Sequence, residues 1–434
     1  MRAPARALGA AFAAAAAACL GAAALVASCA RAPDPGAWAE VREVTPDFLA
    51  ARGALHAALA ADAHGRVALT FVTRDTAGAA DLWLSVSADS GVGWSEPVRV
   101  NVRPGAVSSY AESRPVPAWG EGGRLAVAWS EVRGDDPMVA DLVVRASGDG
   151  GASFAPPVAV NDDAGGRAAF HGFPALAFLD DGTLFAAWMD EREVRAAAAR
   201  GHAALARDAE PSSAHVFAAR SPDGGLSFGA NRAVTDRMCP CCRPAVVVSG
   251  ARVALAYRAA GGDLRDPALA VSSDGGATFA LDTLIAADGW RLPGCPAVGP
   301  ALAATADGAG LYAWYTGAGE PGVWVAPWRA DRGLAGPKRA LRDSLADASH
   351  PRLAALGGGA ALLAVEGRPA GDTTRTVLAV RALEPSGALT PWVFLGARVE
   401  AGWLAALSDR AALAAWTERE ADGRRTRIAR ITRR

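Results

Sequence analysis

Lysine is almost absent from this chain, because Lys338 is the only lysine among 44 basic residues. With so much alanine and glycine, the arginine excess is typical of a GC-rich coding sequence and not of phosphate-binding residues. The formal net charge is −1. No charge excess therefore favours nucleic acid or an anionic membrane surface as a partner, and we expect no nucleic-acid binding.

Long hydrophobic runs are lacking outside the N-terminus. There, a basic start precedes an apolar, alanine-dominated run, Ala7–Val26, which closes on "VASC". This is typical of a secretory signal, and the ending is similar to the bacterial lipobox, whose cysteine carries lipid. We expect a signal peptide over 1–28, lipidation at Cys29, a tether over 29–37, and a membrane-anchored lipoprotein in the periplasm or on the cell surface. The alternative is a membrane-spanning anchor, which weakly apolar alanine disfavours.

One alternating apolar element recurs seven times and ends each time in aromatic or polar residues and a charged loop. A shorter apolar run such as "FPALAF" or "RPAVVV" precedes it, usually across a Gly/Asp turn. These pairs predict strand–turn–strand units, and a unit of about 50–60 residues is the size of a propeller blade. The copies are "RVALTFVTRD" from Arg66, "RLAVAWSEVR" from Arg124, "TLFAAWMDER" from Thr183, "RVALAYRAAG" from Arg252, "GLYAWYTGAG" from Gly310, "AALLAVEGRP" from Ala360 and "AALAAWTERE" from Ala411.

Four units continue into a second signature, Ser-x-Asp-x-Gly-x-x-aromatic. It predicts a self-contained turn in which the aspartate accepts bonds from turn amides, glycine takes a positive φ and the aromatic ring packs on the sheet. We therefore expect these aspartates to be structural. The copies are "SADSGVGW" at Ser87, "SGDGGASF" at Ser147, "SPDGGLSF" at Ser221 and "SSDGGATF" at Ser272.

This signature resembles the Asp box, or BNR repeat, of the sialidase superfamily, and the resemblance implies an all-β propeller over 38–434. Sialidases of this superfamily have six blades, whereas seven units predict seven. A six-bladed ring with an appended hairpin is the alternative. The last unit supplies three strands, so "WAEVREV", Trp38–Val44, is expected to add its outer strand. The Ala/Arg-rich insertion Val194–Glu210 favours a short surface helix.

A ligand site is expected where the loops that lead into the innermost strands meet the loops that follow the second strands. The basic candidates for contact with an anion or sugar there are Arg114, His171, Arg258 and Arg265. The candidates for chemistry are Asp190, Asp266 and Tyr315. The alternative is that these charged side chains lie at loop tips, contact only solvent and have no role in binding.

Sialidases place an arginine triad on the sialate carboxylate and use a Tyr–Glu nucleophile pair with an aspartate acid/base. The family's early Arg-Ile-Pro motif is missing here, because the first inner strand reads "GALHAALA". The nearest analogue is "SRPVPAW", with Arg114 and Pro115, one unit later. Arg114, Arg258 and Arg265 could supply the triad, but no spacing supports it. Exo-sialidase-like hydrolysis therefore stays an open expectation.

Cysteine is scarce, yet Cys239, Cys241 and Cys242 fall within "CPCC" and Cys295 lies at the matching place in the next unit. Disulfides, a thiolate site for Zn²⁺ or Cu(I), and a redox thiol are three open interpretations. Met238 or His171 could add metal ligands. Bacterial sialidase-like and BNR-repeat proteins resemble this chain in pairing "CPCCR" with "DGWRLPGCPAVGPAL". That likeness implies a site built from cysteines and arginines.

The function expected from these features is binding, with or without hydrolysis, of a glycan or small acidic ligand by a lipid-anchored, extracytoplasmic propeller. Whether the protein is an enzyme is left open. Two alternatives stand beside this one: a metal-binding or redox propeller centred on the four cysteines, and a non-catalytic interaction scaffold.

Overall fold

The computed structural model describes residues 38–434 except 167, 200–213, 236, 306–307 and 332. The chain divides into two units, 1–37 and 38–434. The expected signal peptide, the lipidated Cys29 and the tether therefore lie outside the described residues. Among the described residues, no helix has both the length and the apolar character needed to cross a membrane.

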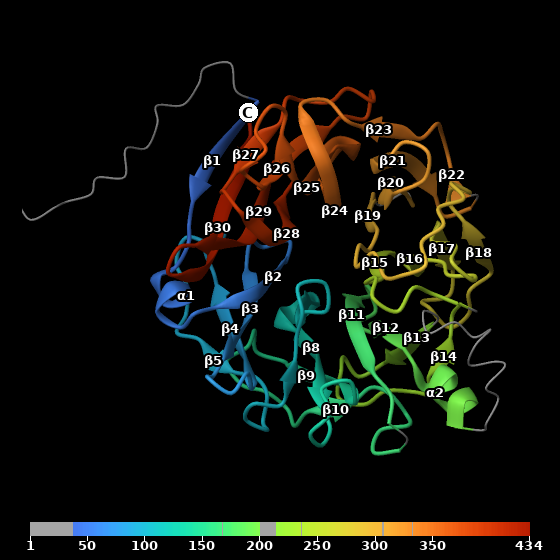
Figure 1. The fold of residues 1–434 in the computed structure, drawn as a ribbon. Helices are drawn as coiled ribbons and strands as arrows, with labels where there is room; N and C mark the ends of the chain where they lie inside the picture. The colour runs from blue at the N-terminus through green and yellow to red at the C-terminus, as the bar shows by residue number, and fades with distance from the viewer. Residues whose placement is uncertain (1–37, 167, 200–213, 236, 306–307, 332) are drawn as a thin grey trace, which may run out of the picture. The chain divides into compact units, whose positions relative to one another are not determined.

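The described residues of 38–434 form seven antiparallel sheets that follow one another around a central channel (Figure 1), and the fold is a seven-bladed β-propeller. In each sheet at least half of the residues of the second strand are buried, since each blade packs between two neighbours. The predicted blade number is confirmed, and the six-bladed alternative is wrong.

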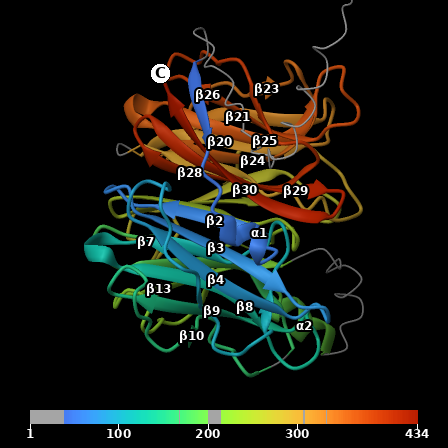
Figure 2. The same cartoon turned by 90° about the vertical axis from the view of Figure 1, so that its left-hand side faces the viewer.

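The first three blades come from the N-terminal half of the propeller, and Figure 2 shows β2, β3 and β4 side by side in blade 1. Blade 1 contains β2 (Leu55–Ala61), β3 (Val67–Arg74), β4 (Ala80–Ser87) and β5 (Val98–Arg99). Blade 2 contains β6 (Val107–Ser108), β7 (Val116–Trp119), β8 (Leu125–Val132), β9 (Ala140–Ser147) and β10 (Val158–Ala159). Blade 3 contains β11 (His171–Phe178), β12 (Leu184–Asp190), β13 (His215–Ser221) and β14 (Arg232–Ala233).

Three further blades continue in chain order around the ring. Blade 4 contains β15 (Ala245–Ser249), β16 (Arg252–Arg258), β17 (Pro267–Ser272) and β18 (Leu281–Leu284). Blade 5 contains β19 (Ala301–Ala304), β20 (Ala309–Thr316), β21 (Gly322–Arg329), β22 (Gly333–Leu334) and β23 (Arg339–Leu341). Blade 6 contains β24 (Leu345–Ala355), β25 (Ala361–Pro369), β26 (Val377–Leu383) and β27 (Val393–Leu395).

Blade 7 closes the ring with strands from both ends of the propeller. It contains β28 (Val399–Ser408), β29 (Ala411–Glu420), β30 (Gly423–Arg433) and β1 (Ala39–Glu43). The pairing of β1 with β30 is antiparallel and sets Val41 opposite Ile431. The outer strand predicted from "WAEVREV" is confirmed. Closure gives β30 a hydrogen-bonded neighbour where it would otherwise be an edge strand.

The four Asp-box turns have the predicted geometry. In the box of blade 2, the Asp149 carboxylate accepts hydrogen bonds from the backbone N–H and the hydroxyl of Ser153, at 2.8 and 2.6 Å. The glycine of the motif, Gly151, has a φ of 93°, which glycine tolerates without steric cost. These bonds stay within the turn between the third and the outer strand, as a structural role requires.

Helices are short and few in the described part of the propeller. They are α1 (Asp47–Ala51), α2 (Arg192–Ala199), and the 3₁₀ turns η1 (Glu121–Gly123) and η2 (Gly357–Gly359). The helix predicted over Val194–Glu210 is present as α2 in its first part. The remainder of that segment lies outside the described residues.

Candidate functional site

A cavity of about 180 Å³ lies in the central channel, lined by the inner strands of blades 2 to 7 and by residues that precede them. Most of its lining residues are apolar, among them prolines, leucines and Trp403, but polar atoms make up the larger part of its exposed surface. Four charged side chains reach into this lining: Glu112, Arg114, Arg243 and Arg352. The cavity therefore combines apolar side chains with a charged cluster that supplies much of its exposed surface.

The backbone of the inner strands is bent at matching places, which helps to set the direction of these side chains. His56, Phe173, His350 and Ala401 all have φ between 52 and 57°. Register shifts in the pairing with the second strand accompany these positions, as between Ser349 and Arg352. A left-handed residue inside such a bulge re-aims the side chains that follow it. Proline follows His350 and Phe173 and restricts the next φ angle.

Glu112 is the centre of the charged cluster. Its carboxylate pairs with Arg352 and lies 3.2 Å from Nε of Arg243, and the Gly299 N–H donates to it at 3.4 Å. Burial by itself would raise the pKa of Glu112. The charges of Arg352 and Arg243 outweigh burial and hold that pKa well below its usual range. Glu112 is therefore a permanent anion that anchors two arginines.

Arg114 is the third arginine of the cluster and is 2% exposed. Its Nη1 donates to the carbonyl oxygens of Ala57 and Ala401 at 2.8 and 3.1 Å, and its Nε donates to Ala111. Burial and the charge of Arg352 lower its pKa to about 9. The strands of blades 1 and 7 thus hold this guanidinium in the channel by backbone carbonyls.

Trp403 gives two of these guanidinium groups a common platform. The guanidinium carbons of Arg114 and Arg352 lie 5.2 and 5.5 Å from the centre of its ring. Within about 6 Å of an indole face, such cations are attracted by the ring quadrupole. Nε of Arg352 is buried and has no hydrogen-bond partner among the described residues. Three guanidinium groups and one carboxylate leave an excess of positive charge in the cavity.

A second cavity, of about 290 Å³, lies at blades 1, 2 and 7. Ala111 and Ala401, whose carbonyls hold Arg114, also line this cavity. Its polar groups include His56, whose Nδ1 lies 2.9 Å from Oγ of Ser109. Burial and the charge of Arg114 lower the pKa of His56 to about 3, so this ring is neutral at physiological pH. The wall also contains the exposed Tyr110, the acidic Glu400 and the basic Arg74 and Arg424.

The structure does not place the expected triad of Arg114, Arg258 and Arg265 around one point. The donors of Arg258 are used by the carbonyl oxygens of Val298, Arg265 and Tyr315. Arg265 donates to Gly262, Leu264 and Gly294. Both guanidinium groups are fully buried and tie loops together beside the cysteines. Of the three, only Arg114 lines the channel cavity.

Asp266 and Tyr315 lie with these two arginines and not in the channel cavity. Asp266 is buried and accepts hydrogen bonds from the N–H groups of Gly289 and Trp290, at 3.0 Å each. The Tyr315 ring packs edge-on against Trp290, with 5.3 Å between ring centres. In this position Asp266 acts as an anchor for the loop at residues 289–290.

Asp190 and His171 form a separate buried pair in blade 3. The Nε2 atom of His171 lies 3.1 Å from Asp163 and 3.5 Å from Asp190, and Nδ1 donates to the Ala140 carbonyl at 2.7 Å. Asp190 also accepts from the Trp188 indole at 2.8 Å. Burial opposes protonation of His171, but the two carboxylates raise its pKa. His171 thus faces two carboxylates in blade 3, and its expected role as an added metal ligand stays a prediction.

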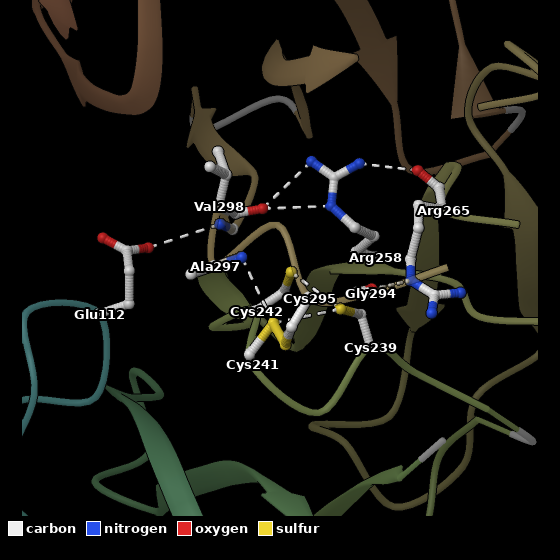
Figure 3. Close-up of a disulfide and its surroundings, with 11 residues drawn as sticks. Glu112, Cys239, Cys241, Cys242, Arg258, Arg265, Gly294, Cys295, Ala297 and Val298 are labelled. Atoms are coloured by element: carbon white, nitrogen blue, oxygen red, sulfur yellow. Dashed lines mark hydrogen bonds between the residues drawn. A yellow bond between two sulfur atoms is a disulfide. The ribbon is translucent and has the colours of Figure 1, made fainter. Parts of the chain in front are cut away.

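The cysteines of neighbouring blades meet, as their positions predict (Figure 3). Cys241 and Cys295 form a disulfide, while Cys239 and Cys242 are free and buried. The Sγ atom of Cys239 lies 3.1 Å from that of Cys242 and 3.6 Å from that of Cys241. Ligand atoms of Cys239, Cys241 and Cys242 lie within 4.8 Å of one another, which suits a soft cation. With Cys241 oxidised, only two of them are thiols.

Sequence reasoning missed Glu112, Arg243, Arg352 and Trp403. One signal was available: Arg243-Pro244 repeats Arg114-Pro115 at the start of an inner strand. Arg352 and Trp403 follow the bulges at His350 and Ala401. The sequence does not show that these bulges turn them toward one point.

Comparison with known proteins places the chain by its fold. No protein-family model and no curated protein sequence matches it. The polysaccharide lyase Uly1 is 11% identical, with 87% of this chain and 89% of that chain covered and a TM-score of 0.52. A Dyadobacter fermentans protein of unknown function is 16% identical, with coverage of 91% and 99% and a TM-score of 0.49. The Trypanosoma rangeli sialidase in complex with the inhibitor DANA is 12% identical, with coverage of 87% and 54% and a TM-score of 0.46. Structural neighbours thus include polysaccharide lyases and sialidases. At these identities the likeness shows the propeller fold.

Proposed function

We propose that this protein binds an acidic saccharide at the mouth of its propeller channel. The observation that carries the proposal is the convergence of Arg114, Arg243 and Arg352 on one cavity that contains a single carboxylate, Glu112, among its lining residues. The carboxylate or sulfate group of the ligand would occupy the cavity beside the guanidinium groups.

The chemistry of the cluster suits this ligand class. Guanidinium groups present paired N–H donors that match carboxylate oxygens, and such hydrogen bonds are stronger than neutral ones. Glu112 neutralises one of the three positive charges, so two remain uncompensated and attract an additional anion. At roughly 30 Å³ per water molecule, a space of about 180 Å³ holds an acidic group and part of a sugar ring.

The second cavity, of about 290 Å³, offers room for the rest of the saccharide. Arg114 links the two cavities, because Ala111 and Ala401 hold it by their carbonyls and also line the second cavity. The exposed Tyr110 ring and the Glu400 carboxylate provide an aromatic face and an acceptor for sugar hydroxyls. A bound saccharide would thus place its acidic end in the channel, and its neutral sugar units would extend toward the surface.

Recognition is supported better than hydrolysis. The carboxyl group in the channel cavity, Glu112, is held ionised by two arginines, so it is poorly suited to donate a proton. Asp190 and Asp266 are fully buried among hydrogen-bond partners elsewhere. Cleavage of a sialoside or a uronate by this protein would add glycan processing to the proposed binding function, in line with the resemblance to sialidases.

The proposal includes an extracytoplasmic location with a lipid at Cys29. It rests on the apolar run before "VASC" and agrees with the Cys241–Cys295 disulfide, because disulfides persist outside the cytoplasm. Globomycin treatment of expressing cells tests the anchor: accumulation of an unprocessed precursor supports it. Normal processing and release of the protein from membranes contradict it.

Titration calorimetry with the full chain tests the saccharide site. The probes are N-acetylneuraminic acid, glucuronic acid and oligogalacturonate, with glucose as the neutral comparison. We expect binding of at least one acidic probe, weakened about tenfold, or about 1.4 kcal/mol, by Arg352→Lys, which keeps the charge but loses the planar fork. Arg99→Lys on the outer strand β5 is the matched control. Absence of binding by every acidic probe overturns the proposal, and release of fluorophore from a sialoside would add hydrolysis to it.

A further inference from the structure

The four cysteines form two pairs that touch each other but differ in exposure. Cys239 and Cys242 are 0% exposed, Cys241 is half-buried and Cys295 is exposed. The turn at Cys239-Pro240-Cys241-Cys242 is closed by the Cys242 N–H, which donates to the Cys239 carbonyl at 3.2 Å. The buried pair thus has the spacing Cys-x-x-Cys, which brings two thiols within reach of one disulfide.

The buried dithiol lies against the existing disulfide. Between Cys239 and Cys241 the Sγ atoms are 3.6 Å apart, close to the distance of about 3–3.5 Å at which reacting atoms are poised. The Sγ atoms of Cys239 and Cys242 are 3.1 Å apart. Cys239 is therefore in contact with a sulfur atom of each possible partner, one oxidised and one reduced (Figure 3).

The surroundings favour a thiolate on Cys239 in particular. The hydrogen bond from Cys242 and the charges of Arg258 and Arg265 outweigh burial and lower the pKa of Cys239 to about 7. Burial raises the pKa of Cys242. On the side of Cys241, the Ala297 N–H donates to the sulfur at 3.3 Å and would stabilise negative charge when that sulfur leaves.

We propose that these cysteines form a thiol–disulfide exchange centre, in which the buried Cys239–Cys242 dithiol reduces an external disulfide through the Cys241–Cys295 pair. This function is independent of saccharide binding. The substrate class is a disulfide-bonded small molecule or protein that can reach Cys295 at the surface.

The internal steps need no other reagent. The Cys239 thiolate attacks the Cys241 sulfur, the Cys241–Cys295 bond breaks, and Cys295 leaves as a thiolate that takes a proton. The Cys242 thiol gives up its proton and attacks the Cys239 sulfur, which releases the Cys241 thiolate. The disulfide has moved to Cys239–Cys242, and two thiols remain at Cys241 and Cys295.

The external steps return the outer pair to its starting state. The Cys295 thiolate attacks one sulfur of the external disulfide, which forms a mixed disulfide and releases one external thiolate. The Cys241 thiolate then attacks Cys295, and the second external thiolate leaves. In sum, the buried dithiol loses two electrons and two protons, and the external disulfide becomes two thiols.

Oxidised glutathione and disulfide mapping of the full chain test this proposal. We expect a glutathione adduct on Cys295, release of two glutathione molecules per chain, and a final Cys239–Cys242 disulfide found by mass spectrometry after alkylation. Cys239→Ser should lower the rate of glutathione release at least tenfold. Cys242→Ser is the matched variant, and it should stop at the Cys239–Cys241 bond with Cys295 held as a glutathione adduct and one glutathione released per chain.

Two results overturn the proposal. One is an unchanged Cys241–Cys295 disulfide with free Cys239 and Cys242 after incubation with oxidised glutathione. The other is stoichiometric zinc or copper in the purified wild-type chain, with thiols protected from alkylation, which would assign the cluster to a metal. Disulfide mapping of the wild-type chain decides between these outcomes even if a serine variant fails to fold. Circular dichroism would show whether each variant is folded.

Discussion

Arg352 of blade 6 donates a hydrogen bond to the carboxylate of Glu112 of blade 2, 240 residues away in the chain and inside the propeller channel. Arg243 of the loop before blade 4 lies on the other carboxylate oxygen. One acidic side chain therefore joins three non-adjacent blades. This arrangement fixes the geometry of the cavity and makes the cluster testable by substitution.

Replacement of Glu112 by glutamine should destabilise the protein and strengthen its binding of anions. The change leaves Arg243 and Arg352 buried without their counter-charge, which costs about 3 to 5 kcal/mol for a buried pair. Urea denaturation measures the free energy of unfolding, and calorimetry with glucuronic acid measures binding. Glu96→Gln, at an exposed position, is the control. Unchanged stability would mean that the ion pairs are not formed in solution.

Replacement of Trp403 by leucine should weaken binding of an acidic saccharide about tenfold. The ring holds the guanidinium groups of Arg114 and Arg352, and such contacts contribute about 0.5–2 kcal/mol. Trp403→Phe, which keeps an aromatic face, should recover part of the affinity. If leucine and phenylalanine variants bind equally, the aromatic face has no role in orienting the arginines.

His171 should make the stability of the propeller depend on pH. Asp163 and Asp190 raise its folded pKa above the unfolded value of about 6.5, so the native state binds the proton more tightly than the unfolded chain. The contribution of protonated His171 to the free energy of unfolding is fully present below about pH 6.5, and it is lost as pH rises through the folded pKa of His171. Urea denaturation of wild type and His171→Gln should therefore show a difference that shrinks as pH increases.

The control for this pH series is His64→Gln at an exposed position in blade 1. It should show no comparable trend, because this side chain has no such buried carboxylate pair. A His171→Gln difference that is constant between about pH 5 and pH 9 would contradict a raised pKa.

Ser272→Ala in the fourth Asp box should lower the stability of the protein and leave saccharide binding unchanged. The buried Ser272 hydroxyl accepts from the Gly276 N–H at 2.8 Å and donates to Asp274 at 2.6 Å. Removing it leaves a buried N–H unpaired, at a cost of about 1–3 kcal/mol. Thermal unfolding measures this loss, with exposed Ser386→Ala as the comparison. A loss of saccharide binding in Ser272→Ala would instead show that the boxes contribute to the site.

Much of the fold could be predicted because its information is local. Alternation of apolar residues, the Gly/Asp turns and the Ser-x-Asp-x-Gly boxes each act over fewer than about twelve residues. The outer strand β1 could be predicted because a blade with three strands leaves an edge that needs a partner. The meeting of the "CPCC" cysteines with Cys295 could also be expected, because Cys239 and Cys295 hold matching places in consecutive units, but that placement does not indicate that Cys241 is the one bonded to Cys295.

The candidate site could be predicted only in part. Arg114 lines the channel cavity, whereas Arg258 and Arg265 lie beside the cysteines, where they donate to loop carbonyls. Charged residues near a functional face look alike in sequence, whether they hold a loop or contact a ligand. Several carbonyl oxygens that accept hydrogen bonds from these arginines belong to segments distant in the chain, so no sequence spacing indicates these partners.

By itself, the sequence determined the repeating blades, their number, the Asp-box turns and the strand that closes the ring, because short-range periodicity and turn chemistry dictate each of them. Only the tertiary structure decided which arginines face the channel and which cysteines pair. Closure of the ring brings Glu112, Arg243 and Arg352 together from separate blades. Left-handed bulges in the inner strands then set the direction of the side chains. That convergence depends on the geometry of the ring and on the backbone conformation of the bulges, and no local sequence pattern indicates either of them.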